Sequence, residues 1–160
     1  MKMIIIFILI MIFYIYLFIY YFFKYFLFLS IFSMKNIYNI DVSDWEENTD
    51  YEGYSPSDEI IINFWKIVSK LPQEKLSRLL QFSTGSTRVP VGGFKSLQSN
   101  RGKLAPFSIY KIEYEKGKKN YIKARTCFNR INLPNFPNEE KLLEAINFVI
   151  DNEILGFGIE

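Results

Sequence analysis

The apolar run from Met3 to Phe23 constrains the fold of this chain more than any other feature. These twenty-one residues include no charged residue, proline, glycine or other small residue. A helix needs about 20 residues to cross a hydrocarbon core of about 30 Å. A cleaved signal peptide would have a shorter apolar core and a small-residue cleavage site. The run therefore predicts a transmembrane helix that acts as a signal anchor.

A second interpretation of this apolar head stays open. The run resumes after Lys24 and continues to Lys35, using almost only Ile, Phe, Tyr, Leu and Met. A wrongly assigned translation start would also produce such a low-complexity mixture. We expect two parts, an apolar segment over residues 1–40 and a domain over residues 41–160. Lys24 and Lys35 favour a cytoplasmic domain, membrane-anchored through residues 3–23 if the run is a true anchor.

The composition excludes several kinds of site. The chain has no histidine and one cysteine, so an internal disulfide framework and a Ser-His-Asp triad are excluded, as is a structural zinc site. No metal and no cofactor are expected. The net charge of +2 gives no reason to expect a nucleic-acid partner. The unpaired thiol suits a reducing compartment.

Two amphipathic helices are predicted early in the domain. Residues 58–70 carry apolar side chains with helical spacing, and Ser55 or Ser57 is placed to cap this helix. A second helix is expected to start at Pro72 and to run through residues 73–82. The positions expected to face the core are Ile61, Phe64, Trp65 and Val68 in the first helix, and Leu76, Leu79 and Leu80 in the second.

The sequence pattern of residues 83–151 predicts a loop, a short sheet and a closing helix. Residues 83–94 are rich in Gly, Ser and Thr, which is typical of a loop. Residues 107–114 predict a strand that turns at 115–120 into a second extended stretch over 121–133. Residues 138–151 predict a helix whose core-facing residues are Leu142, Leu143, Ile146, Val149 and Ile150. This order indicates a small α+β domain of several helices packed on a short β-sheet.

The single cysteine, Cys127, has two interpretations when it is taken alone. A cysteine beside Phe128 in an apolar strand is usually a buried small hydrophobe. However, Arg125 and Arg130 lie within three residues of it, and cationic neighbours favour a reactive thiolate.

Four blocks of the sequence resemble one known family. They are "DWEENTDYEGYSPSDEIIINFWKIV", "LLQFSTGSTRVPVGGF", "TCFN" followed by "LP", and a terminal "GFG". Their order and spacing over residues 44–160 are similar to those of the C-terminal catalytic lobe of the HECT ubiquitin ligases. The resemblance implies a HECT C-lobe-like α+β fold.

The resemblance also implies an activity and its residues. Cys127 would accept ubiquitin as a thioester from a ubiquitin-conjugating enzyme and pass it to a lysine of a protein substrate. Thr126 and Asn129 would shape the loop around the sulfur, and Phe128 is expected to anchor the strand. In the tail, Phe157 matches a phenylalanine that helps to orient the lobes, and Glu160 would supply an acid near the lysine.

The chain departs from the family pattern in two ways. Arg125 stands where the family usually has a histidine, although this arginine would still favour a thiolate at Cys127. The N-terminal lobe that recruits the conjugating enzyme is not recognisable before Asp41, so we expect a fragment that lacks this lobe. The alternative to a ligase is therefore a non-catalytic lobe that binds ubiquitin or a ligase partner.

Overall fold

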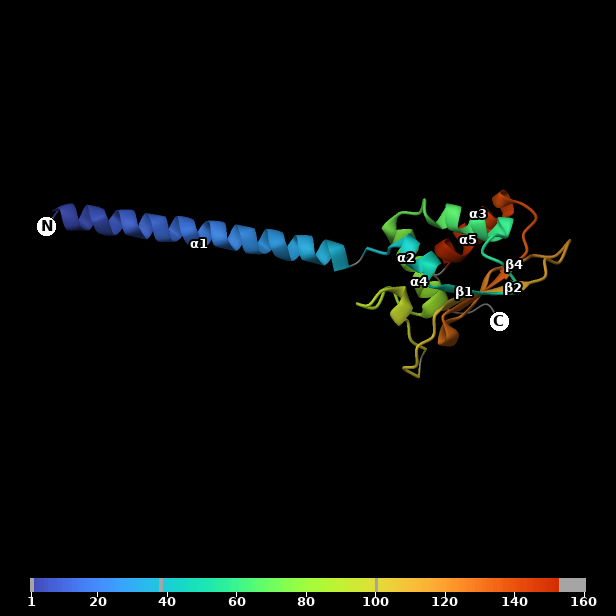
Figure 1. Ribbon diagram of the computed structural model, residues 1–160. Helices are drawn as coiled ribbons and strands as arrows, with labels where there is room; N and C mark the ends of the chain where they lie inside the picture. Colours follow the sequence, from blue (N-terminus) through green and yellow to red (C-terminus); the bar gives the residue numbers. More distant parts are fainter. Residues whose placement is uncertain (1, 38, 100, 153–160) are drawn as a thin grey trace. The chain divides into compact units, whose positions relative to one another are not determined.

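The structure, a computed structural model, describes residues 2–37, 39–99 and 101–152 (Figure 1). The chain divides into two compact units, Met1–Asn39 and Ile40–Glu160. Because their relative placement is not determined, each unit is described by itself.

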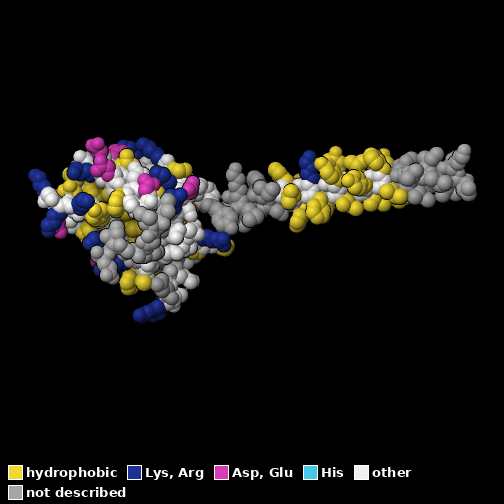
Figure 2. Space-filling model, turned by 180° about the vertical axis from the view of Figure 1, so that it is seen from behind, with side chains coloured by type: hydrophobic (Ala, Val, Ile, Leu, Met, Phe, Trp, Pro, Cys, Tyr) yellow, Lys and Arg dark blue, Asp and Glu magenta, His cyan; other side chains and the backbone are white. Residues whose placement is uncertain are grey.

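The first unit is one helix, α1 (Lys2–Ile37). At 1.5 Å per residue, a helix of this length measures about 54 Å. Its segment Met11–Phe28 is long and apolar enough to span a bilayer, and none of it is buried. Apolar side chains of that segment cover most of the face that Figure 2 shows, and nearly all of them are exposed. A helix that is apolar on all sides needs an apolar environment.

The second unit confirms the predicted α+β class, with helices packed on a four-stranded sheet. Helices α3, α4 and α5 fall within two residues of their predicted bounds, whereas α2 and β1 were not predicted. The elements are α2 (Val42–Glu47), β1 (Thr49–Glu52), α3 (Glu59–Val68), α4 (Gln73–Thr84), η1 (Phe94–Ser96), β2 (Phe107–Ile112), β3 (Lys123–Arg125), η2 (Thr126–Phe128), β4 (Arg130–Pro134) and α5 (Glu139–Asn152).

The sheet has the order β1-β2-β4-β3. Strand β2 pairs in parallel with both β1 and β4, and β3 pairs antiparallel with β4. The predicted hairpin between residues 107–114 and the following extended stretch is therefore wrong. Strand β4 brings Ile131 and Leu133, both fully buried, next to β2, whereas Ala124 of β3 is only half-buried. The strand with more apolar surface to bury takes the inner position.

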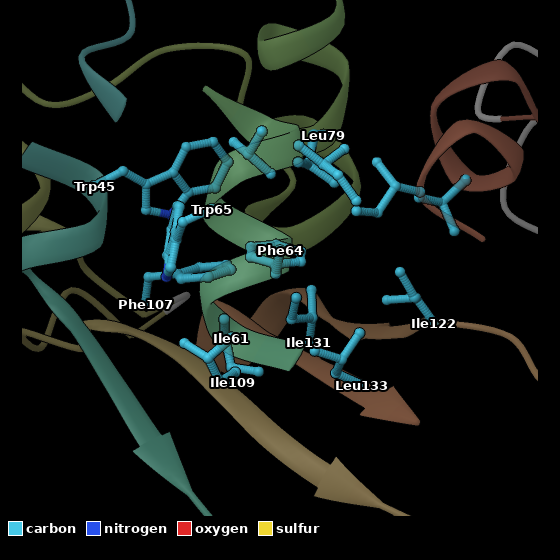
Figure 3. Close-up of a cluster of buried hydrophobic side chains, with 14 of the residues drawn as sticks. Trp45, Ile61, Phe64, Trp65, Leu79, Phe107, Ile109, Ile122, Ile131 and Leu133 are labelled. Carbon is cyan, nitrogen blue, oxygen red and sulfur yellow. The ribbon is translucent and has the colours of Figure 1, made fainter. Parts of the chain in front are cut away.

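The helices cover one face of the sheet, and Trp45 of α2 is fully buried against other aromatic rings of the core (Figure 3). Its ring stacks on Phe94 at a centroid distance of 4.8 Å and meets Trp65 and Phe107 edge-on at 6.0 and 5.2 Å. The predicted core positions of α3 and α4 are all buried, so both amphipathic patterns are confirmed.

Two details of the helices differ from expectation. Leu143 is 41% exposed, and Ala145 is buried instead, because the inward face of α5 follows positions 142, 145, 146, 149 and 150. At the start of α3, Asp58 is the N-cap residue, not Ser55 or Ser57. The Asp58 carboxylate instead accepts a hydrogen bond from the Ser55 backbone N–H at 2.9 Å, which fixes the turn before the helix.

Candidate active site

Cys127 lies in the middle of η2, the short turn that joins β3 to β4. Its side chain is exposed. The interpretation of this cysteine as a buried small hydrophobe is therefore wrong. The reason is local: β4 begins only at Arg130, so Cys127 precedes the strand whose inward positions are buried.

Asn129 ends the turn with the left-handed conformation, at φ 50°. Asparagine tolerates this region better than most residues because its short side chain can hydrogen-bond locally. The side chain is 2% exposed, and its Nδ2 donates to the carbonyl oxygens of Gln98 at 3.1 Å and Ala105 at 2.8 Å. The Asn129 carbonyl accepts from the Ser108 N–H of β2 at 3.0 Å. Asn129 thus joins the cysteine turn to the sheet and to a second loop.

That second loop, residues 98–105, lies beside the cysteine turn. It is closed by a bridge between Gln98 and Leu104 and by a hydrogen bond from the Ser99 N–H to the Lys103 carbonyl at 2.8 Å. Gly102 takes a positive φ of 71° at its tip. The sequence motifs around Cys127 gave no reason to include this loop, because its contact with the turn runs through backbone carbonyls that any residue type supplies.

The C-terminal end of α4 forms another side of the turn. Gly85 ends this helix in the left-handed conformation, at φ 77°. A Cβ atom placed on Gly85 would lie 3.8 Å from the Cβ of Thr126, so the loop after α4 packs directly on η2. The predicted loop over residues 83–94 is held from the other side by Asp44, whose carboxylate accepts from the Phe94 N–H at 2.8 Å.

Phe128 does not anchor the strand, contrary to prediction, since 56% of its surface is exposed. The Phe128 ring is linked to the sheet through the side chain of Arg130. The guanidinium carbon of Arg130 lies 3.8 Å from the ring centroid of Tyr110 and 5.7 Å from that of Phe128. Tyr110 also hydrogen-bonds to the Glu52 side chain, and this bond is the largest cause of the raised pKa of Tyr110. Cation–π contacts of this kind hold an arginine flat against a ring.

Arg125 is exposed at the end of β3, in register with Arg130 across the hairpin. The two arginines therefore lie on either side of the turn that carries Cys127. Phe157 and Glu160 fall outside the described residues. Among the residues that are described, no group of three His, Cys, Asp or Glu side chains could hold a metal ion.

A cavity of about 310 Å³ lies elsewhere in the domain. Its lining includes Tyr54, Asn63, Lys111 and Asn135, and no residue of the cysteine turn. Tyr54 is fixed there by a hydrogen bond from its hydroxyl to the Leu133 carbonyl at 3.0 Å, and its pKa is raised chiefly by burial. The cysteine turn itself is exposed, which suits a macromolecular partner better than a small ligand.

Comparisons with known proteins agree with this description. A family model described as HECT-domain (ubiquitin-transferase) matches residues 21–160. The probable E3 ubiquitin-protein ligase hulA of Aspergillus fumigatus is 46% identical over 124 residues, which cover 78% of this chain and 15% of that protein. The E3 ubiquitin-protein ligase RSP5 of Emericella nidulans is 45% identical over 124 residues, covering 78% of this chain and 14% of that protein.

The chain thus spans about 15% of the length of the curated relatives it matches. Its resemblance to the HECT ligases, first indicated by the blocks around Cys127, is confirmed by the family match, which covers most of the sequence. The chain belongs to the HECT-domain family of ubiquitin transferases.

Proposed function

We propose that this chain carries the ubiquitin-accepting step of an E3 ubiquitin-protein ligase, with Cys127 as the acceptor. The observation that carries the proposal is the exposed position of Cys127 on a turn held by β3, β4 and Asn129. An acceptor thiol must be reached by two proteins in succession, a conjugating enzyme and a substrate. A thiol on an exposed turn meets this requirement.

The chemistry needs little from the surrounding residues. In the first step, the Cys127 thiolate attacks the thioester carbonyl of the loaded conjugating enzyme, a new C–S bond forms, and the enzyme's thiolate leaves. In the second step, a neutral lysine amine attacks the new thioester. The C–N bond forms, Cys127 leaves as thiolate, and the amine proton passes to a base or to solvent. An arginine side chain does not act as a general base, so Arg125 can assist only electrostatically.

Single-turnover loading tests this proposal. The full chain is fused through a flexible linker to a ubiquitin-conjugating enzyme, because a tether supplies a roughly millimolar effective concentration of the enzyme. We expect a ubiquitin adduct on the chain that disappears on treatment with thiol reductant. A wild-type chain that forms no reducible adduct under these conditions, while the tethered enzyme is fully loaded, would contradict the proposal.

We further propose that α1 anchors the chain in a membrane, with the second unit in the cytosol. The support is the exposed apolar surface of Met11–Phe28, which water would solvate unfavourably. Lysine placed near the middle of a spanning helix costs roughly 2.5–3.5 kcal/mol on insertion scales. Membrane-bound protein is therefore expected to depend on the apolar character of this segment.

Cell fractionation tests the membrane proposal. The wild-type chain is expected to stay in the pellet after alkaline carbonate extraction. A variant with Ile15→Lys and Ile19→Lys is expected to move to the supernatant. Release of the wild-type chain by carbonate, to the same extent as this variant, would reject the anchor and leave the ligase proposal untouched.

A further inference from the structure

The net charge of the chain conceals a strong separation of charge along the sequence. Residues 75–138 contain thirteen Lys and Arg residues and only two acidic residues, Glu113 and Glu115. Residues 41–74 contain nine Asp and Glu residues and two lysines, and residues 139–160 contain six acidic residues and one lysine. Cys127 lies inside the basic segment.

The fold gathers part of this basic segment around Cys127. Arg101 and Lys103 lie on the 98–105 loop, which Asn129 holds beside the turn. Arg125 ends β3 directly before the turn, and Lys123 lies at the other end of this short strand, opposite Asn132 of β4. All four side chains are exposed, and we call these four residues the basic rim.

No short ion pair among the described residues includes a residue of the basic rim, although Glu115 lies close enough to Lys123 to interact with it electrostatically. The four ion pairs within the described ranges join Lys66, Lys75, Arg78 and Lys118 to acidic residues, and none includes a residue of the rim. Glu115 lies three residues after the C-terminal end of β2, which is the end of the strand away from Cys127. Asp50 and Glu52 lie on β1, which β2 and β4 separate from β3.

Figures 1 and 2 show where the loop, the turn and the charged side chains of the second unit lie. The 98–105 loop and the η2 turn lie at the lower end of the second unit in Figure 1. In the view of Figure 2, Lys and Arg side chains reach that lower end, whereas acidic side chains are visible only above it. A surface of one sign steers partners of the opposite sign and suppresses those of the same sign.

We propose that the basic rim selects the substrate: the thioester on Cys127 is transferred to lysines that lie in acidic segments of the substrate protein. This inference rests on the proposed ligase function. A substrate lysine brings a positive charge towards a positive surface, so Asp and Glu residues on either side of it must supply the attraction. Because the rim lies on two elements that flank the turn, acidic residues on both sides of the lysine can contact it.

Single-stranded nucleic acid fits this surface less well. Proteins that bind such strands combine basic residues with several aromatic side chains on which bases stack. Beside Cys127, the exposed aromatic ring among the described residues is Phe128, and Arg130 already lies over one face of the neighbouring Tyr110. We therefore assign the rim to an acidic protein segment and use RNA as a competing probe.

A charge-reversal pair with a matched control tests the proposal. The test variant is Arg101→Glu with Lys103→Glu, on the exposed 98–105 loop. The control is Lys116→Glu with Lys119→Glu, on the exposed turn after β2, at the end of that strand away from Cys127. Both variants change the net charge equally, and both turns carry a positive-φ glycine that is left unchanged.

Two measurements are made on each full-length chain. The first is fluorescence anisotropy of a labelled peptide whose single lysine lies between runs of Asp and Glu, compared with the same peptide carrying Asn and Gln instead. The second is the rate at which ubiquitin-loaded chain transfers ubiquitin to each peptide. Binding is also measured on the Cys127→Ala chain, so that it does not depend on the thioester chemistry.

We expect the wild-type chain to bind the acidic peptide about tenfold more tightly than the neutral one at about 0.05 M salt, and less so at about 0.3 M. The rim reversal is expected to remove this preference and to slow transfer to the acidic peptide about tenfold, while transfer to the neutral peptide changes less than about twofold. The control reversal is expected to change either value by less than about twofold.

Three results would overturn the rim proposal. They are equal binding of the two peptides by the wild-type chain, equal effects of the two reversals, and tighter binding of single-stranded RNA than of the acidic peptide at the same salt. If the acidic peptide binds as expected but no chain forms a thioester, the binding surface stands and the ligase function is rejected.

Discussion

Replacing Cys127 with alanine is expected to abolish the ubiquitin adduct, and replacing it with serine to leave a weak adduct that reductant does not remove. Alanine supplies no nucleophile, and serine forms an oxygen ester that thiols do not exchange as thioesters do. Because the side chain is exposed, neither change should alter the free energy of unfolding by more than about 0.5 kcal/mol. Gel electrophoresis with and without reductant measures both outcomes.

The control for this prediction moves the thiol to another exposed turn. A chain with Cys127→Ala and Lys119→Cys keeps one accessible cysteine, at the turn between β2 and β3. We expect it to remain without ubiquitin, because the neighbours of Cys127 are missing there. Loading of this chain at the wild-type rate would mean that any exposed thiol suffices and would remove the special role of the cysteine turn.

Replacing Asn129 with aspartate is expected to produce the largest loss of stability among substitutions near the turn. The carboxylate would face the carbonyl oxygens of Gln98 and Ala105 at hydrogen-bond distance, without the protons that Asn129 donates. Both hydrogen bonds are part-buried, and losing each costs about 1–3 kcal/mol, so we expect a loss of roughly 2–6 kcal/mol. Urea unfolding followed by tryptophan fluorescence measures it, since Trp45 and Trp65 are both buried in this unit.

Two further substitutions separate the contributions of Asn129. Asn129→Gly keeps the left-handed backbone and removes only the side-chain hydrogen bonds. Asn129→Ala removes these bonds but keeps a Cβ at the positive φ, so we expect the alanine variant to be about 1 kcal/mol less stable than the glycine variant. Equal unfolding free energies for the aspartate and glycine variants would contradict the proposed contact between this side chain and the two carbonyls.

The helices of the second unit could be predicted because their packing follows a local pattern. The spacing of Ile61, Phe64, Trp65 and Val68 depends only on the helical period, and all four are buried. The sheet could not be predicted in the same way. Pairing of β2 with β1 joins Thr49 to Phe107, and no local pattern indicates a contact between segments so far apart.

The candidate site was predicted in part for the same reason. The motif around Cys127 identified the turn, and its polar neighbour Asn129 was expected to shape it. The exposure of Cys127 and Phe128 could not be deduced, because it depends on β4 beginning at Arg130 and not two residues earlier. The hydrogen bonds from Asn129 to Gln98 and Ala105 could not be predicted either, since both residues accept through their backbone carbonyls.

The strand order of the sheet also bears on the synthesis of the protein. Strand β2 leaves the ribosome after β1 and before β4, and in the finished sheet Ile109 is fully buried between these two neighbours. Until β4 has emerged, one edge of β2 offers unpaired N–H and C=O groups, which other chains can pair with. The segment that carries Cys127 therefore belongs to the last part of the sheet to be synthesised. A nascent chain stalled before residue 130 should depend on chaperones to remain soluble.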